Sequence, residues 1–106
     1  MAVKITLFCN AGMSTSLLVK RMQDEAAKQG KDYDINAYGL SFVPEEASKA
    51  DVILVGPQVR HAVSMIKDKA GEKTPVVPID MRMYGMIDAK GVLREAEKIL
   101  AEKGLV

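Results

Sequence analysis

The only cysteine of the chain, Cys9, opens a run of small and hydroxyl-bearing residues that reads Cys9-Asn10-Ala11-Gly12-Met13-Ser14-Thr15-Ser16. Backbone N–H groups in such a run, followed by the start of a helix, form a concave site for an anion. The hydroxyls of Ser14, Thr15 and Ser16 would add donors. The same amides and helix dipole would stabilise a thiolate at Cys9. The run therefore predicts a nucleophilic sulfur beside a cradle of phosphate size.

Each part of this run also has a simpler interpretation. A lone cysteine at the end of a strand is often a small buried hydrophobic residue. Serine and threonine are common first residues of helices. The functional hypothesis therefore depends on where the fold places the run.

Short β-branched stretches alternate with amphipathic ones along the chain. The expected strands cover residues 3–8, 33–38, 52–55 and 75–79. The expected helices cover residues 14–29, a short turn at 44–48, residues 59–70, and a last helix capped by Asp88. This order predicts an α/β fold, a doubly wound parallel sheet of about four strands with helices on both faces. We expect the flavodoxin-like strand order 2-1-3-4, with the proline-containing last strand at an edge.

In such a sheet, ligands bind beyond the carboxyl ends of the strands, beside the first strand. The loop from Asn10 to Ser16 follows that strand directly. Asp80, Tyr84 and Asp88 follow the last strand and should return to the same edge. Asp80 is a candidate general acid or an ordinary strand-end residue, Tyr84 a candidate phosphate contact, and Asp88 a helix cap.

His61 is the only histidine and falls between the apolar positions of its expected helix, so we expect it to face solvent. Without a second histidine or cysteine nearby in sequence, we expect neither a metal site nor a cofactor. Four methionines, Met13, Met81, Met83 and Met86, gather near the expected site. They predict either flexible core filler or an adaptable rim for protein partners.

Length and composition exclude several classes of protein. The chain has 106 residues, one cysteine and a formal net charge of +1, which favours one domain over 1–106 without an internal disulfide. Near-neutral charge argues against a nucleic-acid or anionic-membrane binder. The longest apolar run, 52–55, is far shorter than the ~20 residues of a membrane span. With no signal-peptide pattern at the N-terminus, we expect a cytoplasmic protein without membrane insertion.

A comparable strand–loop–helix occurs in low-molecular-weight tyrosine phosphatases, where an arginine six positions after the cysteine clamps the phosphoryl group. Here that position is Thr15. Without the guanidinium, hydrolysis would be poorly supported, and the loop suits a carrier that holds a phosphoryl group and passes it on. A small cysteine phosphatase, an arsenate-reductase-like enzyme and a non-catalytic anion-binding module remain alternatives.

Three stretches resemble one family. They are residues 8–18, residues 50–59 with Leu54-Val55-Gly56-Pro57-Gln58, and the later Ile79-Asp80, Tyr84-Gly85 and Gly91-Val92-Leu93. They closely resemble the lactose/cellobiose-type IIB components of the bacterial sugar phosphotransferase system. The resemblance implies a protein-phosphohistidine–sugar phosphotransferase, a monomer that works with two partners. A phosphohistidine of the IIA protein would phosphorylate Cys9, with residues Asn10 to Ser16 cradling the phosphate. Phosphocysteine would then phosphorylate a β-glucoside or disaccharide, of cellobiose, chitobiose or lactose type, carried by the membrane protein IIC.

Overall fold

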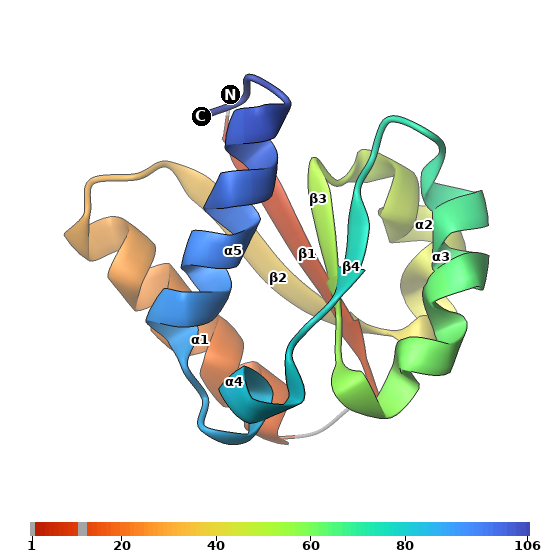
Figure 1. Cartoon of the computed structure of the whole chain (residues 1–106), viewed down its shortest axis with the longest axis horizontal. Coiled ribbons are helices and arrows are strands. Elements are labelled where there is room, and N and C mark those ends of the chain that lie inside the picture. Colours follow the sequence, from red (N-terminus) through yellow and green to blue (C-terminus); the bar gives the residue numbers. More distant parts are fainter. Residues whose placement is uncertain (1, 11–12) are drawn as a thin grey trace.

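The chain folds around a four-stranded, all-parallel sheet in the order β2-β1-β3-β4 (Figure 1). The computed structural model describes residues 2–10 and 13–106. The strands are β1 Val3–Cys9, β2 Tyr33–Gly39, β3 Val52–Val55 and β4 Val76–Pro78. The predicted class and strand order are confirmed, with β2 and β4 at the edges.

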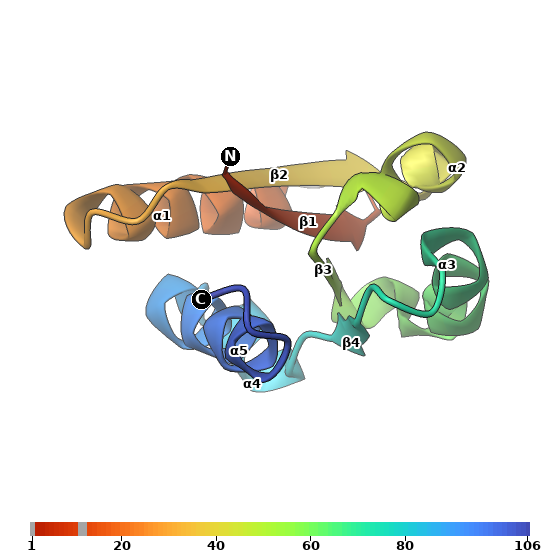
Figure 2. The same ribbon diagram turned by 90° about the horizontal axis from the view of Figure 1, so that it is seen from above.

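Helices cover both faces of this sheet (Figure 2). They are α1 Met13–Lys28, α2 Val43–Glu46, α3 Val63–Ala70, α4 Met81–Gly85 and α5 Ala89–Glu102, with short 3₁₀ stretches at Leu40–Phe42, Ala47–Lys49 and Pro57–Ala62. Helices α1 and α5 pack on one face and α2 and α3 on the other. Each crossover thus returns the chain to the same edge of the sheet, as parallel strands require.

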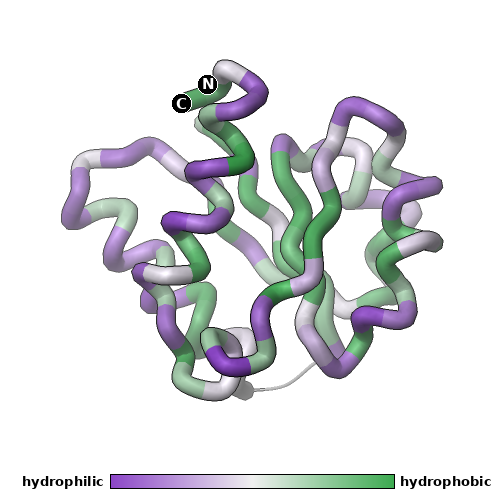
Figure 3. Tube along the Cα trace, in the orientation of Figure 1, coloured by the Kyte–Doolittle hydropathy of each residue, from purple (hydrophilic) through white to green (hydrophobic). Residues whose placement is uncertain are grey.

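Side-chain alternation along β1 separates two hydrophobic cores. Ile5 and Leu7 point to the face under α1 and α5, whereas Phe8 belongs to the core under α2 and α3. All three are fully buried. Figure 3 shows the hydrophobic strands at the centre of the molecule and hydrophilic residues on the outer turns of the helices. Strand β1 is therefore held from both sides, which makes its carboxyl end a rigid position.

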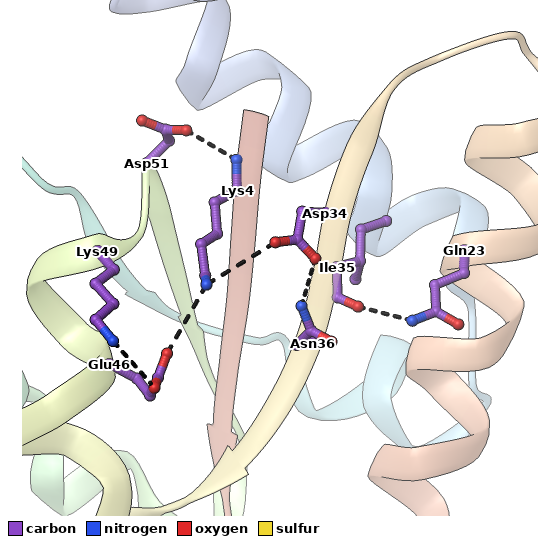
Figure 4. Close-up of polar contacts among 8 residues, drawn as sticks. All are labelled: Lys4, Gln23, Asp34, Ile35, Asn36, Glu46, Lys49 and Asp51. Carbon is purple, nitrogen blue, oxygen red and sulfur yellow. Dashed lines mark hydrogen bonds and ion pairs between the residues drawn. The ribbon is translucent and has the colours of Figure 1, made fainter. Parts of the chain in front are cut away.

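Polar contacts fasten the opposite end of β1 (Figure 4). The Lys4 backbone N–H donates to Asp51 at 2.8 Å. The Lys4 ammonium lies 3.9 Å from Asp34 on β2 and 3.8 Å from Glu46 on α2. Such ion pairs add little stability individually, but the partners of Lys4 lie on β2, on α2 and just before β3. They help to set the position of β1 along the sheet.

The helix predicted over 59–70 is wrong in its first four residues. Pro57–Ala62 forms a 3₁₀ stretch in which Val59 leaves helical geometry, and α3 begins only at Val63. Proline lacks an N–H, and the turn that follows it closes through a hydrogen bond from the Val59 N–H to the Gly56 carbonyl at 3.0 Å. The tighter 3₁₀ winding is compatible with burial of the apolar side chains, since Val59 and Ala62 still lie in the core.

The predicted cap of the last helix is confirmed. The Gly91 N–H donates to the Asp88 carboxylate at 3.0 Å, which satisfies one of the free donors at the start of α5. A Cβ at Gly91 would collide with the carboxylate of Asp88. Glycine at this position therefore makes room for the cap.

We expect Gly91→Ala to disable this cap and lower the free energy of unfolding by about 1 kcal/mol. Asp88→Ala should cost about as much in the native chain and close to nothing after Gly91→Ala, because both changes remove one interaction. Urea denaturation of the two single variants and the double variant measures this coupling. Full additivity would contradict the steric argument, and exposed Lys90→Ala in the same turn is the control.

Candidate functional site

Cys9 is the last residue of β1 and lies at the carboxyl edge of the sheet. It pairs with Gly39, the last residue of β2, and is 4% exposed. Strand alternation assigns its side chain to the face of Ile5 and Leu7, which α1 covers. Figure 1 shows the start of α1 and helix α4 at the same edge, opposite the two chain termini. The predicted position of the cysteine is thereby confirmed.

Gly56 brings the next strand unusually close to this cysteine. Its N–H donates to the Phe8 carbonyl at 2.8 Å, and a Cβ on Gly56 would lie 3.3 Å from the Cβ of Cys9. A larger residue here would press on the cysteine. The sequence interpretation did not single out Gly56 as a site residue, although a glycine directly after a central strand is a recognisable signal for close backbone approach.

The structure describes only part of the expected phosphate loop. Ala11 and Gly12, and the side chains of Met13 and Ser14, lie outside the described residues. Asn10 is exposed at a bend just after β1, and Ser16 is exposed in the first turn of α1. The backbone of this turn therefore stands at the edge where Cys9 ends β1.

Thr15 differs from the expected picture of a free phosphate donor. Its side chain is 2% exposed, and its Oγ1 lies 2.6 Å from the hydroxyl of Tyr84 on α4, with either oxygen as donor. Tyr84 is itself 8% exposed. The sequence analysis placed the hydroxyls of Thr15 and Tyr84 separately near a phosphate. In the structure they form a hydrogen bond with each other. The position that holds arginine in the phosphatase motif is here a buried threonine.

The aspartates of this region cap helices. Asp80 accepts from the Met83 N–H at 3.1 Å at the start of α4, a helix that the sequence analysis missed. Asp88 caps α5 in the same way. His61 is exposed on the 3₁₀ stretch after β3, as predicted. The structure thus gives Asp80 a structural hydrogen bond at the strand end, matching the simpler of its two interpretations.

The methionines near the site fall into two groups. Met81 and Met86, at the two ends of α4, are 68% and 72% exposed. Met83 is half-buried and packs against the core between β1 and α5, which fits the core-filler alternative for this residue. A groove of about 470 Å³ begins at Met86 and runs between α1 and the start of α5. Exposed apolar side chains at this edge include Met81 and Met86 at α4, half-exposed Leu17 on α1, and Phe42 in the 3₁₀ stretch after β2.

Within residues 2–10 and 13–106, no three His, Cys, Asp or Glu side chains are grouped as a metal ion would need. Among the helices of the same described residues, none has the length and apolar character to cross a membrane.

Comparison with known proteins places this geometry in a family. Residues 4–95 match the family described as PTS system, Lactose/Cellobiose specific IIB subunit. The chain is 38% identical over 101 residues to the oligo-beta-mannoside-specific EIIB component of Bacillus subtilis, covering 94% of this chain and 98% of the relative. It is 41% identical over 102 residues to the galactose-specific and to the cellobiose-specific EIIB components of Lactococcus lactis, covering 91% of this chain and 94% of each relative.

Solved structures support the same assignment. The cellobiose-specific IIB component of Borrelia burgdorferi is 30% identical, with a TM-score of 0.79 and coverage of 97% of this chain and 95% of that one. The lactose-specific IIB domain of Streptococcus pneumoniae, at 15% identity and a TM-score of 0.76 over 92% of this chain and 97% of that one, shows the fold alone. With a parallel sheet that ends in Cys9 and a family match over most of its length, the chain belongs to the lactose/cellobiose-specific IIB subunits of the phosphoenolpyruvate:carbohydrate phosphotransferase system.

Proposed function

We propose that this chain is a cytoplasmic phosphocarrier whose Cys9 accepts a phosphoryl group from a phosphohistidine of the IIA protein. Phosphocysteine then donates the group to a β-glucoside or disaccharide, of cellobiose, chitobiose or lactose type, bound by the membrane protein IIC. The observation that carries this proposal is the place of Cys9, at the end of the central strand and at the edge where α1 begins. Residues Asn10 to Ser16 are the proposed phosphate loop.

Both transfers are displacements at phosphorus. In the first, the Cys9 thiol gives up its proton and its sulfur forms a bond to phosphorus, while the phosphorus–nitrogen bond breaks and the donor imidazole nitrogen takes up a proton in exchange. In the second, a sugar hydroxyl gives up its proton and attacks phosphorus, and the phosphorus–sulfur bond breaks as the departing sulfur takes up a proton in exchange. Helix N-terminal amides stabilise the charge that develops on the phosphoryl oxygens.

The alternative is a small cysteine phosphatase or an arsenate-reductase-like enzyme. Water would then have to attack the phosphocysteine, with a cation stabilising the transition state. Thr15 occupies the motif position of the clamping arginine, and its hydroxyl is engaged by Tyr84. Transfer to a sugar is therefore favoured over hydrolysis.

Intact-mass spectrometry tests the proposal directly. We expect the chain to gain one phosphate-sized mass when incubated with phosphohistidine-bearing IIA protein, and to lose it when IIC membranes and cellobiose, chitobiose or lactose are added. No gain in mass would overturn the proposal. Rapid turnover of a chromogenic aryl phosphate by the chain alone would instead favour the phosphatase.

The exposed ends of α4 give a prediction about docking. Exposed methionines suit a surface that must accept two different proteins in turn. We expect Met81→Ser with Met86→Ser to raise the donor concentration needed for half-maximal transfer about tenfold, leaving the maximal rate unchanged, because each side chain contributes ~0.5–1 kcal/mol of contact.

Stopped-flow transfer over a range of IIA concentrations measures this change. Leu105→Ser with Val106→Ser is a matched control, since these side chains are 41% and 50% exposed at the opposite edge of the molecule (Figure 1). An unchanged half-saturating concentration in the methionine variant, or an equal change in the control, would rule out docking at α4.

A further inference from the structure

The hydrogen bond between Thr15 and Tyr84 joins the first turn of α1 to α4, across 69 residues of sequence. We propose that Tyr84 is a positioning residue for phosphoryl transfer. It acts through Thr15 to hold the first turn of α1, and with it the free amides of that turn, in line with the sulfur of Cys9. This inference rests on the proposed function and assigns Tyr84 a role other than contact with the phosphate.

Helix α4 is a firm support for Tyr84. Asp80 caps its first turn, and the Asp88 N–H donates to the Met83 carbonyl at 2.9 Å at its end. The Tyr84 carbonyl also accepts from the Ile87 N–H at 3.1 Å. The helix is thus tied to the end of β4 on one side and to the start of α5 on the other. The phenol ring packs in the core that contains Leu7 and Leu18.

Thr15 is placed where a small movement would matter most. The first four N–H groups of a helix lack carbonyl partners within the helix, and these groups would face an anion at the helix start. Thr15 is the third residue of α1, so its side chain anchors this turn. Three residues link Cys9 to α1. Packing and the Tyr84 hydroxyl help to set the direction of this turn.

The phosphoryl group comes within reach of these amides only as it moves from the donor histidine onto the Cys9 sulfur, so they stabilise the transition state more than the docked complex. A first turn of α1 that points away from the sulfur should therefore lower the maximal rate of transfer. The donor concentration needed for half-maximal transfer should not change. A residue with only a structural role would instead change stability without this kinetic signature. The two roles are separable by experiment.

Single-turnover transfer from IIA protein to Tyr84→Phe is the main test. Phenylalanine keeps the ring and removes the oxygen. We expect the maximal rate to fall about tenfold, the change that ~1.4 kcal/mol of lost transition-state stabilisation produces. The half-saturating donor concentration should stay within about twofold. Thr15→Val should have the same effect, the double variant should be no slower than either single one, and Thr15→Ser should restore most of the rate.

Tyr33→Phe provides a matched control. The Tyr33 hydroxyl donates to Glu97 at 2.6 Å. The pKa of this phenol is raised above its ordinary value, mainly by burial and next by the hydrogen bond to the Glu97 carboxylate. The residue begins β2, at the far end of the strands from Cys9. We expect Tyr33→Phe to lose stability and keep its transfer rate. An unchanged maximal rate in Tyr84→Phe, or an equal loss in Tyr33→Phe, would overturn the inference.

Amide hydrogen exchange separates failure of this inference from failure of the proposed function. In Tyr84→Phe, exchange at residues 15–17 should quicken about tenfold relative to the native chain, with no such change in Tyr33→Phe. Failure of the native chain to take up phosphate would overturn the phosphocarrier and the catalytic part of the inference together. Faster exchange with an unchanged transfer rate would overturn the inference alone.

Discussion

Cys9→Ser is expected to lower phosphoryl transfer to the chain by three orders of magnitude or more, as loss of a nucleophile does in other enzymes that use covalent intermediates. A serine hydroxyl is close to the thiol in shape but is a far weaker nucleophile without an adjacent base. His61, the only histidine, is exposed on the 3₁₀ stretch after β3. The native chain should gain a phosphate-sized mass, and Cys9→Ser should not.

Stability measurements show whether Cys9→Ser loses transfer because it unfolds. Cys9 is 4% exposed, so the substitution buries a hydroxyl and should cost about 1–2 kcal/mol of unfolding free energy. That cost leaves most of the 5–15 kcal/mol typical of a domain. His61→Gln is the second control and should accept phosphate normally. A mass gain that survives Cys9→Ser and disappears in His61→Gln would move the phosphorylation site to the histidine.

Phe8→Ala is expected to lower the free energy of unfolding by about 3–5 kcal/mol, the largest loss of stability that we predict. Phe8 is fully buried between β3 and the helices α2 and α3. Its ring centroid lies 6.2 Å from that of Tyr38, in a tilted arrangement. Removing the ring leaves a cavity on the face of the sheet that α2 and α3 cover, opposite the face of the Cys9 side chain, so we expect the main effect to be on stability.

Urea denaturation at two protein concentrations measures the loss, with a constant slope as evidence of two-state unfolding. Phe42→Ala is the matched control. Its ring also contacts Tyr38, at 5.9 Å between centroids, but Phe42 is 47% exposed. We expect it to cost less than 1 kcal/mol. Similar losses for the two variants would contradict the burial argument.

Several elements were predictable because local pattern and burial agree in them. The apolar run Val52–Val55 fits a strand covered on both faces, and β3 is buried throughout. Asp88 followed by a helical stripe predicts a capped helix, and α5 begins there. The β-branched run before the single cysteine predicts a strand, and β1 ends at Cys9. These features depend on neighbours in sequence and on the general handedness of parallel crossovers.

Other features depend on contacts between distant segments, and a local sequence pattern does not encode such contacts. Helix α4 has five residues, too few to show a periodic stripe, and forms around Asp80 and Tyr84. The rim methionines could not be sorted by type, because only packing against the core distinguishes half-buried Met83 from exposed Met81 and Met86. Gly56 matters because of the approach of β3 to Cys9.

The sequence by itself determined the class of the fold, the order of the strands and the place of the only cysteine at the end of the first strand, since these follow from side-chain type and periodicity. Tertiary structure alone decided what surrounds that cysteine. It paired the hydroxyls of Thr15 and Tyr84, two side chains that sequence reasoning had aimed separately at a phosphate. The physical reason is burial: a hydroxyl removed from water needs a partner, and the fold supplied one from 69 residues away.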